Sequence, residues 1–183
     1  MGERVAYPCR GQPFHPGHIG AIIQFFNDNP SDQVIVAVIK NRTRDTRNPF
    51  LSKEALKITR MTLAIYGMKR EVEAKLVKRP GINANKWFDR LKETCKVDGI
   101  LTGNERMAGL AEDFSGLKVF SFTDGEASKI HSSEIRKLMS SDIDEDQSEW
   151  RAMLTPPVAD YILGLNIDWA KLPEARIRDW WHD

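Results

Sequence analysis

Stretches typical of buried strands alternate with stretches of helical periodicity along most of this chain, and this alternation constrains the fold most strongly. Residues 33–40 form a nearly continuous β-branched and apolar run, which is typical of a strand covered on both faces. Comparable stretches predict strands at residues 4–9, 33–40, 71–78, 99–102 and 118–122. The patterns between them predict helices at residues 17–27, 53–66, 86–95 and 105–113.

This order of elements predicts an α/β protein with a Rossmann-like parallel sheet of five or slightly more strands and helices on both faces. Ser52 is the expected N-cap of the helix at residues 53–66. Helical patterns at residues 132–139 and 147–163 follow the last strand, the second interrupted at Pro156 and Pro157. We assign residues 1–165 to one domain and residues 166–183 to a C-terminal tail that packs on it.

The composition excludes several classes of protein. The chain has 183 residues, of which 41% are hydrophobic and 29% charged, and this suits one soluble domain with a sizeable core. A net charge of +1 favours neither a nucleic-acid nor a membrane partner. Cys9 and Cys95 are too far apart in the sequence to suggest a disulfide framework or a metal-ligand pair. Without a membrane-length apolar run or a signal-peptide pattern, we expect a cytoplasmic protein.

The loop after the first strand is the first candidate site, because parallel sheets bind ligands beyond the carboxyl ends of their strands. It contains Arg10, Gln12, His15, Gly17 and His18. A glycine allows the backbone to approach a ligand, and the helix that follows offers free N–H groups to an anion. Two imidazoles there can donate hydrogen bonds to phosphate oxygens. The alternatives are a turn with two incidental histidines, or a metal site short of ligands.

A second candidate lies near the other end of the chain. Ser132 and Ser133 precede a helical pattern that carries Arg136 in its first turns. A hydroxyl can cap the helix, while the spare N–H groups and the guanidinium bind a terminal phosphate. The alternative is an ordinary capped helix with a solvated arginine.

Together these segments resemble the two signature motifs of the nucleotidyltransferase superfamily. The first motif is His-x-Gly-His, and its longer form, Gly-Arg-Phe-Gln-Pro-x-His-x-Gly-His, is typical of archaeal-type nicotinamide mononucleotide (NMN) adenylyltransferases. The chain is similar to this form from position 9 to His18, except that Cys9 and Gly11 replace Gly and Phe. The second motif is Ile-Ser-Ser/Thr-x-x-Arg, and here His131 stands at its first position.

Three further segments resemble the same family. Arg47 begins a stretch similar to Arg-Asp-Pro-Phe, and the resemblance implies that it contacts the triphosphate. The segment from Thr102 through Gly103 to Asn104 is similar to Ser-Gly-Asn and implies contacts with adenine or ribose. The third segment contains Asn83, Asn85 and Trp87.

The resemblance implies that these last three residues bind NMN, with the tryptophan stacked on the pyridine ring. The alternative for Trp87 is a tryptophan in the core.

The resemblance runs from about residue 4 to residue 163 and implies transfer of AMP from ATP to NMN, giving NAD and pyrophosphate. Carried over to this chain, it implies that His15, His18 and Arg136 are catalytic. It also implies ATP contacts from Arg10, Gln12, Gly17, Arg47, Thr102, Gly103, Asn104, Ser132, Ser133 and Arg136. Mg²⁺ is expected to be held mainly by the ATP phosphates, with no metal site on the protein.

Two alternatives stay open. One keeps the chemistry and changes the acceptor to another phosphate monoester such as phosphopantetheine. The other is a non-catalytic nucleotide-binding or RNA-binding module that uses the basic loop at residues 40–47. The tail contains Trp169, Trp180 and Trp181, and we expect these residues to pack on the same domain; the alternative is a contact between copies of the chain. We expect the protein to form a homo-oligomer.

Overall fold

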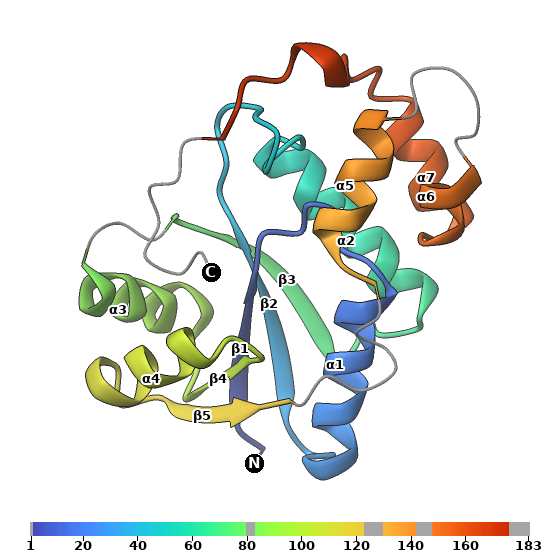
Figure 1. The fold of residues 1–183 in the computed structure, drawn as a ribbon. Helices are drawn as coiled ribbons and strands as arrows, with labels where there is room; N and C mark the ends of the chain where they lie inside the picture. Colours follow the sequence, from blue (N-terminus) through green and yellow to red (C-terminus); the bar gives the residue numbers. More distant parts are fainter. Residues whose placement is uncertain (1, 80–82, 123–129, 142–147, 176–183) are drawn as a thin grey trace.

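The computed structural model describes residues 2–79, 83–122, 130–141 and 148–175. Its five strands are all parallel and form one sheet in the order β3-β2-β1-β4-β5 (Figure 1). The strands are β1 (Arg4–Cys9), β2 (Gln33–Ile39), β3 (Val72–Val77), β4 (Gly99–Thr102) and β5 (Lys118–Ser121). The predicted Rossmann-like α/β fold is therefore confirmed.

The alternation of side chains along β2 explains how this sheet is covered on both faces. Val34, Val36 and Val38 enter one hydrophobic core, and the intervening residues enter a second core on the opposite face. The first core lies under α1 (Pro16–Asp28), α2 (Ser52–Ile65), α5 (Ser132–Ser141), α6 (Ser148–Ala152) and α7 (Pro156–Leu163). The second lies under α3 (Ala84–Cys95) and α4 (Glu105–Phe114).

Two predicted helix boundaries differ in position from those of the structure, for reasons of local chemistry. α2 begins at Ser52 itself, and its N-cap is Leu51, whose backbone N–H donates to the Glu54 carboxylate at 2.8 Å. The Ser52 hydroxyl instead exchanges hydrogen bonds with the backbone of Asn41 and holds the loop before the helix. The predicted break in the helical stretch at residues 147–163 is present, but it lies at residues 153–155, just before the two prolines. Pro156 and Pro157 begin α7, because the first turn of a helix needs no N–H donor.

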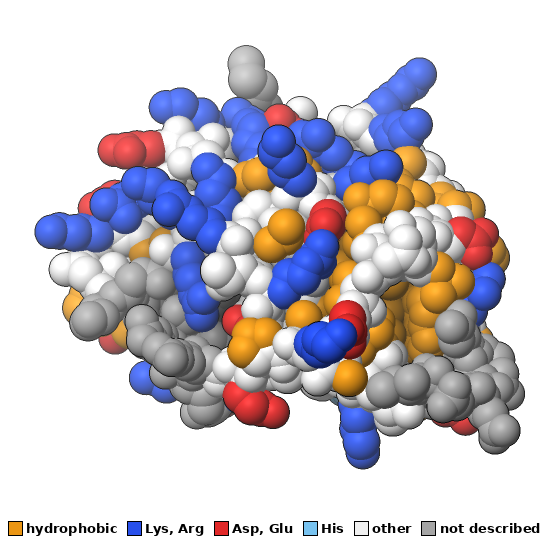
Figure 2. All heavy atoms as spheres, turned by 90° about the horizontal axis from the view of Figure 1, so that it is seen from above, with side chains coloured by type: hydrophobic (Ala, Val, Ile, Leu, Met, Phe, Trp, Pro, Cys, Tyr) orange, Lys and Arg blue, Asp and Glu red, His pale blue; other side chains and the backbone are white. Residues whose placement is uncertain are grey.

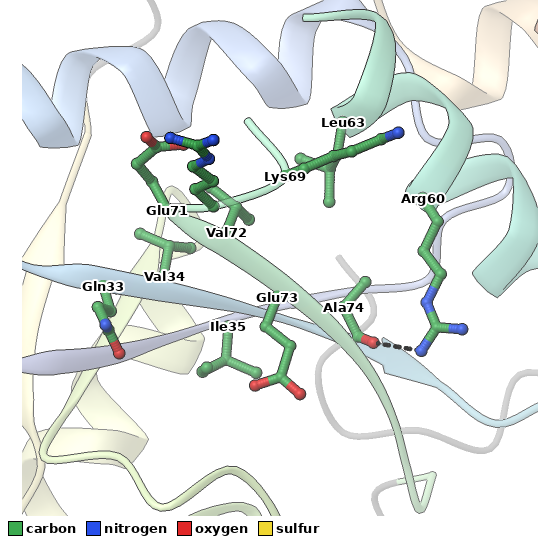
Figure 3. Close-up of a pocket in the computed structure, with 11 residues that line it drawn as sticks. Gln33, Val34, Ile35, Arg60, Leu63, Lys69, Glu71, Val72, Glu73 and Ala74 are labelled. Atoms are coloured by element: carbon green, nitrogen blue, oxygen red, sulfur yellow. Dashed lines mark hydrogen bonds between the residues drawn. The ribbon is translucent and has the colours of Figure 1, made fainter. Parts of the chain in front are cut away.

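β3 is an edge strand, and its outer edge is partly covered. The Arg60 guanidinium on α2 donates to the Ala74 carbonyl at 3.1 Å, and the Val72 N–H donates to the Met68 carbonyl at 3.0 Å. Figure 3 shows this arginine reaching the strand across a hollow of about 580 Å³. Occupied backbone groups protect an edge strand from pairing with another chain.

The described part of the C-terminal tail lies against the domain. Trp169–Lys171 form a short 3-10 helix, η2, and Ile167 and Trp169 pack on the core beneath α1 and α2. Trp180 and Trp181 lie outside the described residues. Among the helices that the structure describes, none is long and apolar enough to cross a membrane.

Candidate functional site

A cavity of about 580 Å³ opens at the carboxyl ends of the strands, where the strand order switches between β1 and β4. It is lined by the loop after β1, the end of β4 and the start of α5, three segments that are far apart in the sequence. Among the predicted site residues, the cavity brings together Arg10, Gln12, His18, Thr102, Gly103, Asn104, Ser132, Ser133 and Arg136. Lys and Arg side chains spread over this face of the molecule (Figure 2).

The cavity lining also includes residues that the sequence analysis did not predict as binding residues, among them Tyr7, Phe122 and His131. Phe122 directly follows β5, so its position at the carboxyl edge of the sheet was a usable signal. His131 directly precedes the second motif and was noted there only as a departure from it. Tyr7 lies within β1 and carried no signal that separates it from a core residue.

The two histidines of the first motif are held in one tautomer by the start of α1. His15 is the N-cap residue, and its Nδ1 accepts a hydrogen bond from the Gly17 N–H at 3.1 Å. The His15 N–H in turn donates to Nδ1 of His18 at 3.2 Å. A backbone N–H can only donate, so each neutral ring carries its proton on Nε2. The pair therefore offers two Nε2–H donors, from rings whose centroids are 3.9 Å apart.

Both rings are neutral at physiological pH. Burial lowers the pKa of His15 to about 2, and electrostatic interactions with His18, His131 and Arg136 act in the same direction. Burial lowers the pKa of His18 to about 4, and this ring also stacks on Phe14 with centroids 4.7 Å apart. A polyanion bound in the cavity would raise both pKa values, because nearby negative charge favours the imidazolium.

Stability is expected to fall as the pH is lowered from 6.5 towards 4. In this window the unfolded chain protonates both histidines near pH 6.5, whereas the folded state keeps them neutral down to about pH 4 and below. Each histidine then lowers the free energy of unfolding by up to about 1.4 kcal/mol per pH unit. Urea unfolding at pH 7 and pH 5 measures the difference.

The matched control for this prediction is the double variant His15→Asn with His18→Asn. Asparagine can accept the same backbone hydrogen bonds at a helix start but does not titrate. The variant should lose less stability between pH 7 and pH 5 than the wild type. Equal losses in the two proteins would show that the histidines are not held neutral in the fold.

α5 is fastened to the first loop by its own motif residues. The Ser132 hydroxyl donates to the Pro13 carbonyl at 3.0 Å, and Nη1 of Arg136 donates to the Gln12 carbonyl at 2.7 Å. Burial and, to a smaller extent, the charge of Arg47 lower the pKa of Arg136 to about 10, so this guanidinium stays charged at neutral pH. Ser133 remains exposed and lines the cavity.

Gln12 has a structural role in addition to its predicted contact with ATP. Its amide exchanges two hydrogen bonds of 2.9 Å with the backbone of Phe50, and the residue is only 1% exposed. Both ends of the side chain are therefore committed to the loop at residues 41–50. Gln12 fixes that loop to the first motif, and because it also lines the cavity its contact with ATP stays a prediction.

The segment after β4 forms the opposite wall of the cavity. A Cβ on Gly103 would come within 2.7 Å of the Phe122 ring, so only glycine fits without moving that ring. Asn104 caps α4 by accepting from the Met107 N–H at 2.8 Å, and its own N–H donates to the Thr102 hydroxyl at 3.1 Å. The cap uses the oxygen of the Asn104 amide, which leaves its NH₂ group as the donor that can face a ligand.

The residues predicted to bind NMN do not line this cavity. Trp87 is 2% exposed in the core under α3, and its Nε1 donates to the Lys78 carbonyl at 2.9 Å. Asn83 caps α3 by accepting from the Lys86 N–H, and Asn85 is exposed on that helix. A ring in this position presents neither face to a ligand, which corresponds to the alternative of a core tryptophan.

The described residues contain no group of three or more His, Cys, Asp or Glu side chains that could hold a metal ion. The lining of the cavity, as far as the structure describes it, also includes no carboxylate.

Comparison with known proteins adds solved structures of the same fold. The chain matches no protein-family model and no curated protein sequence. It is similar to a bifunctional NMN adenylyltransferase/ADP ribose pyrophosphatase from Francisella tularensis complexed with AMP and a manganese ion, with a TM-score of 0.69 and 17% identity. It is also similar to the nicotinic acid mononucleotide adenylyltransferase of Plasmodium falciparum complexed with APC, with a TM-score of 0.63 and 13% identity. It shares their fold.

The lengths of these proteins differ. The similarity covers 94% of this chain but only 52% of the Francisella protein, so the chain spans about half of that protein's length. The similarity to the Plasmodium protein covers 93% of this chain and 98% of the other.

Proposed function

We propose that this chain is an adenylyltransferase that transfers AMP from ATP to NMN, giving NAD and pyrophosphate. The observation that carries the proposal is the cavity at the switch point of the sheet, where His18 of the first motif meets Ser133 and Arg136 of the second. The two motifs are more than a hundred residues apart in the sequence. The fold shared with solved NMN and nicotinic acid mononucleotide adenylyltransferases supports the same chemistry.

In the proposed reaction, a phosphate oxygen of NMN attacks the α-phosphorus of ATP. The bond between that phosphorus and the oxygen bridging to the β-phosphorus breaks, and pyrophosphate leaves with the electron pair. The protein contributes positioning and stabilisation of the developing negative charge. The Nε2–H groups of His15 and His18 are the proposed donors at the transferred phosphate, and Arg136 neutralises the leaving pyrophosphate.

The other predicted ATP contacts divide between the two walls of the cavity. Thr102, Gly103 and Asn104 are proposed to bind adenine and ribose. Arg10, Ser132 and Ser133 are proposed to contact the triphosphate, with Ser132 contributing its backbone N–H because its hydroxyl is bonded to Pro13. Gly17 and Arg47 do not line the cavity, and they are proposed to reach the phosphates from the start of α1 and from the loop at residues 41–50. Mg²⁺ is proposed to enter with ATP, held by the phosphates.

Arg136→Ala is expected to weaken ATP binding by about 1.5–3 kcal/mol, because it removes a charge-assisted contact to phosphate. Arg136→Lys should recover only part of the loss, since an ammonium cannot reproduce the fork of donors. Arg47→Ala should weaken ATP binding in the same range. Isothermal titration with ATP measures all three variants.

Thermal unfolding must accompany these titrations, because Arg136 also bonds to the Gln12 carbonyl. The comparison is made on folded protein at a temperature below the transition. ATP affinities that equal the wild-type value in both alanine variants would place the two arginines outside the binding site.

The activity itself is tested by incubating the protein with Mg–ATP and separate acceptors, and by assaying pyrophosphate and the adenylylated product. NMN, nicotinic acid mononucleotide and phosphopantetheine are the informative acceptors. NAD as the main product supports the proposal, and product from phosphopantetheine alone would keep the chemistry and change the acceptor. ATP binding without turnover on any acceptor would instead favour a nucleotide-binding module. The homo-oligomer and the cytoplasmic location stay predictions.

A further inference from the structure

The C-terminal segment at residues 166–175 crosses the molecule next to the loop at residues 41–50, above the carboxyl ends of the strands (Figure 1). Two hydrogen bonds join the segment to the loop. The Thr46 N–H donates to the Pro173 carbonyl at 3.0 Å, and the Ala175 N–H donates to the Thr46 hydroxyl oxygen at 3.1 Å. Both bonds involve the residue directly before Arg47.

Trp169 connects the same segment to the base of the loop. Its ring meets the Phe50 ring edge to face, with centroids 6.1 Å apart, and Phe50 is fully buried. The backbone of Phe50 is bonded to the Gln12 amide, and the Gln12 carbonyl accepts from Arg136. Since η2 also packs against α5, the tail segment contacts both elements that carry the phosphate-binding arginines.

The positive charges of Arg47 and Arg136 explain why the loop at residues 41–50 needs these contacts with the tail segment. Arg47 lies close enough to Arg136 to lower its pKa, with Asp45 acting in the opposite direction. Two neighbouring guanidiniums repel one another until an anion lies between them. The loop that carries Arg47 must therefore be held by other contacts before the anion arrives. Its own turn supplies part of this support, because the Asp45 carboxylate accepts from the Arg47 N–H at 2.9 Å.

We propose that residues 166–175 position Arg47 opposite Arg136 for one bound polyphosphate, with Trp169 and the backbone around Pro173 as the holding contacts. This inference rests on the proposed function for the identity of the polyphosphate as ATP. Trp169 is a positioning residue here, since it acts through Phe50, while Thr46 is held by the backbone of Pro173 and Ala175. Preorganised side chains bind more tightly because less ordering is required on association.

The test measures ATP affinity by calorimetry in the full-length chain. Trp169→Ala should raise the Kd for ATP about three- to tenfold, as expected when an ordered cationic side chain is released. Trp169→Phe should recover most of the affinity, because a phenyl edge can still meet the Phe50 ring. Thr46→Val keeps the shape of the side chain, removes the acceptor for the Ala175 N–H, and should weaken ATP binding about twofold or more.

Lys171→Ala is the matched control, because Lys171 lies in the same segment, is 84% exposed in its side chain and pairs only locally with Asp168. It should bind ATP like the wild type. With saturating ATP, all variants should keep kcat within about twofold of the wild type, since the reacting groups are unchanged.

A purely structural role for Trp169 predicts a different pattern. Trp169→Ala would then lower the unfolding temperature while its folded fraction bound ATP with the wild-type Kd, and this result would overturn the inference. An equal loss of affinity in Lys171→Ala would overturn it as well. If the wild type and the variants show the expected differences in the Kd for ATP but the wild type adenylylates none of the acceptors, the proposed activity is refuted and the positioning role is supported.

Discussion

His18→Ala is expected to lower the kcat of adenylyl transfer by about 100-fold or more, because it removes a hydrogen-bond donor aimed at charge that develops in the transition state. The Kd for ATP should change much less. The structure supports this separation, since His18 lines the cavity as a neutral ring whose remaining proton is on Nε2. Single-turnover and steady-state assays with Mg–ATP and the acceptor measure the two effects.

His18→Asn is the sharper form of this experiment. The asparagine side chain can accept from the His15 N–H as Nδ1 of the histidine does, but it has no donor at the position of Nε2. We expect a stability near that of the wild type together with the full loss in kcat. Ser140→Ala, on the exposed end of α5, serves as a control with normal turnover. Near-normal kcat in His18→Asn would remove the first motif from the chemistry.

Trp87→Ala is expected to lower the free energy of unfolding by about 3–5 kcal/mol, as for other buried aromatic side chains truncated to alanine. The ring is 2% exposed, packs against Phe88 and donates to the Lys78 carbonyl, so its removal leaves a cavity and an unpaired acceptor. Trp87→Phe should lose less, because it keeps most of the buried apolar area. Urea unfolding provides the comparison.

Kinetics on the same variants test the role predicted from the resemblance. If Trp87 stacks on the pyridine ring of NMN, truncation raises the KM for NMN about tenfold and leaves the KM for ATP nearly unchanged. If it is a core residue, the folded fraction keeps both KM values. The position of the ring favours the second result. A stable Trp87→Ala protein with a selective defect for NMN would contradict the buried placement.

Local patterns predicted the elements of this fold well, because periodicity depends only on neighbouring residues. The β-branched run of β2 predicted a strand covered on both faces, and in the structure its side chains alternate between the two cores. Local patterns were less informative at the ends of elements, where several groups compete for the same backbone donors. Ser52 has the chemistry of an N-cap, but the helix begins at Ser52 itself and its hydroxyl bonds to Asn41, while the Glu54 carboxylate accepts from the N–H of the N-cap residue Leu51.

The sequence by itself determined which residues stand at the carboxyl ends of the strands, and hence which segments could build a site. Only the tertiary structure decided which of them meet, because the strand order brings β1 beside β4 and the late helix α5 onto the first loop. Gln12 and Phe50 are 38 residues apart, and Ser132 and Pro13 are 119 apart. Each polar group bonds to the partner that the folded chain presents, so the Gln12 side chain holds the loop at residues 41–50, a role that the sequence did not reveal. Trp87 lies with Phe88, Leu91 and Cys95 on one face of α3, at a spacing that the sequence contains, and only the packing of that face on the sheet shows that the ring is enclosed.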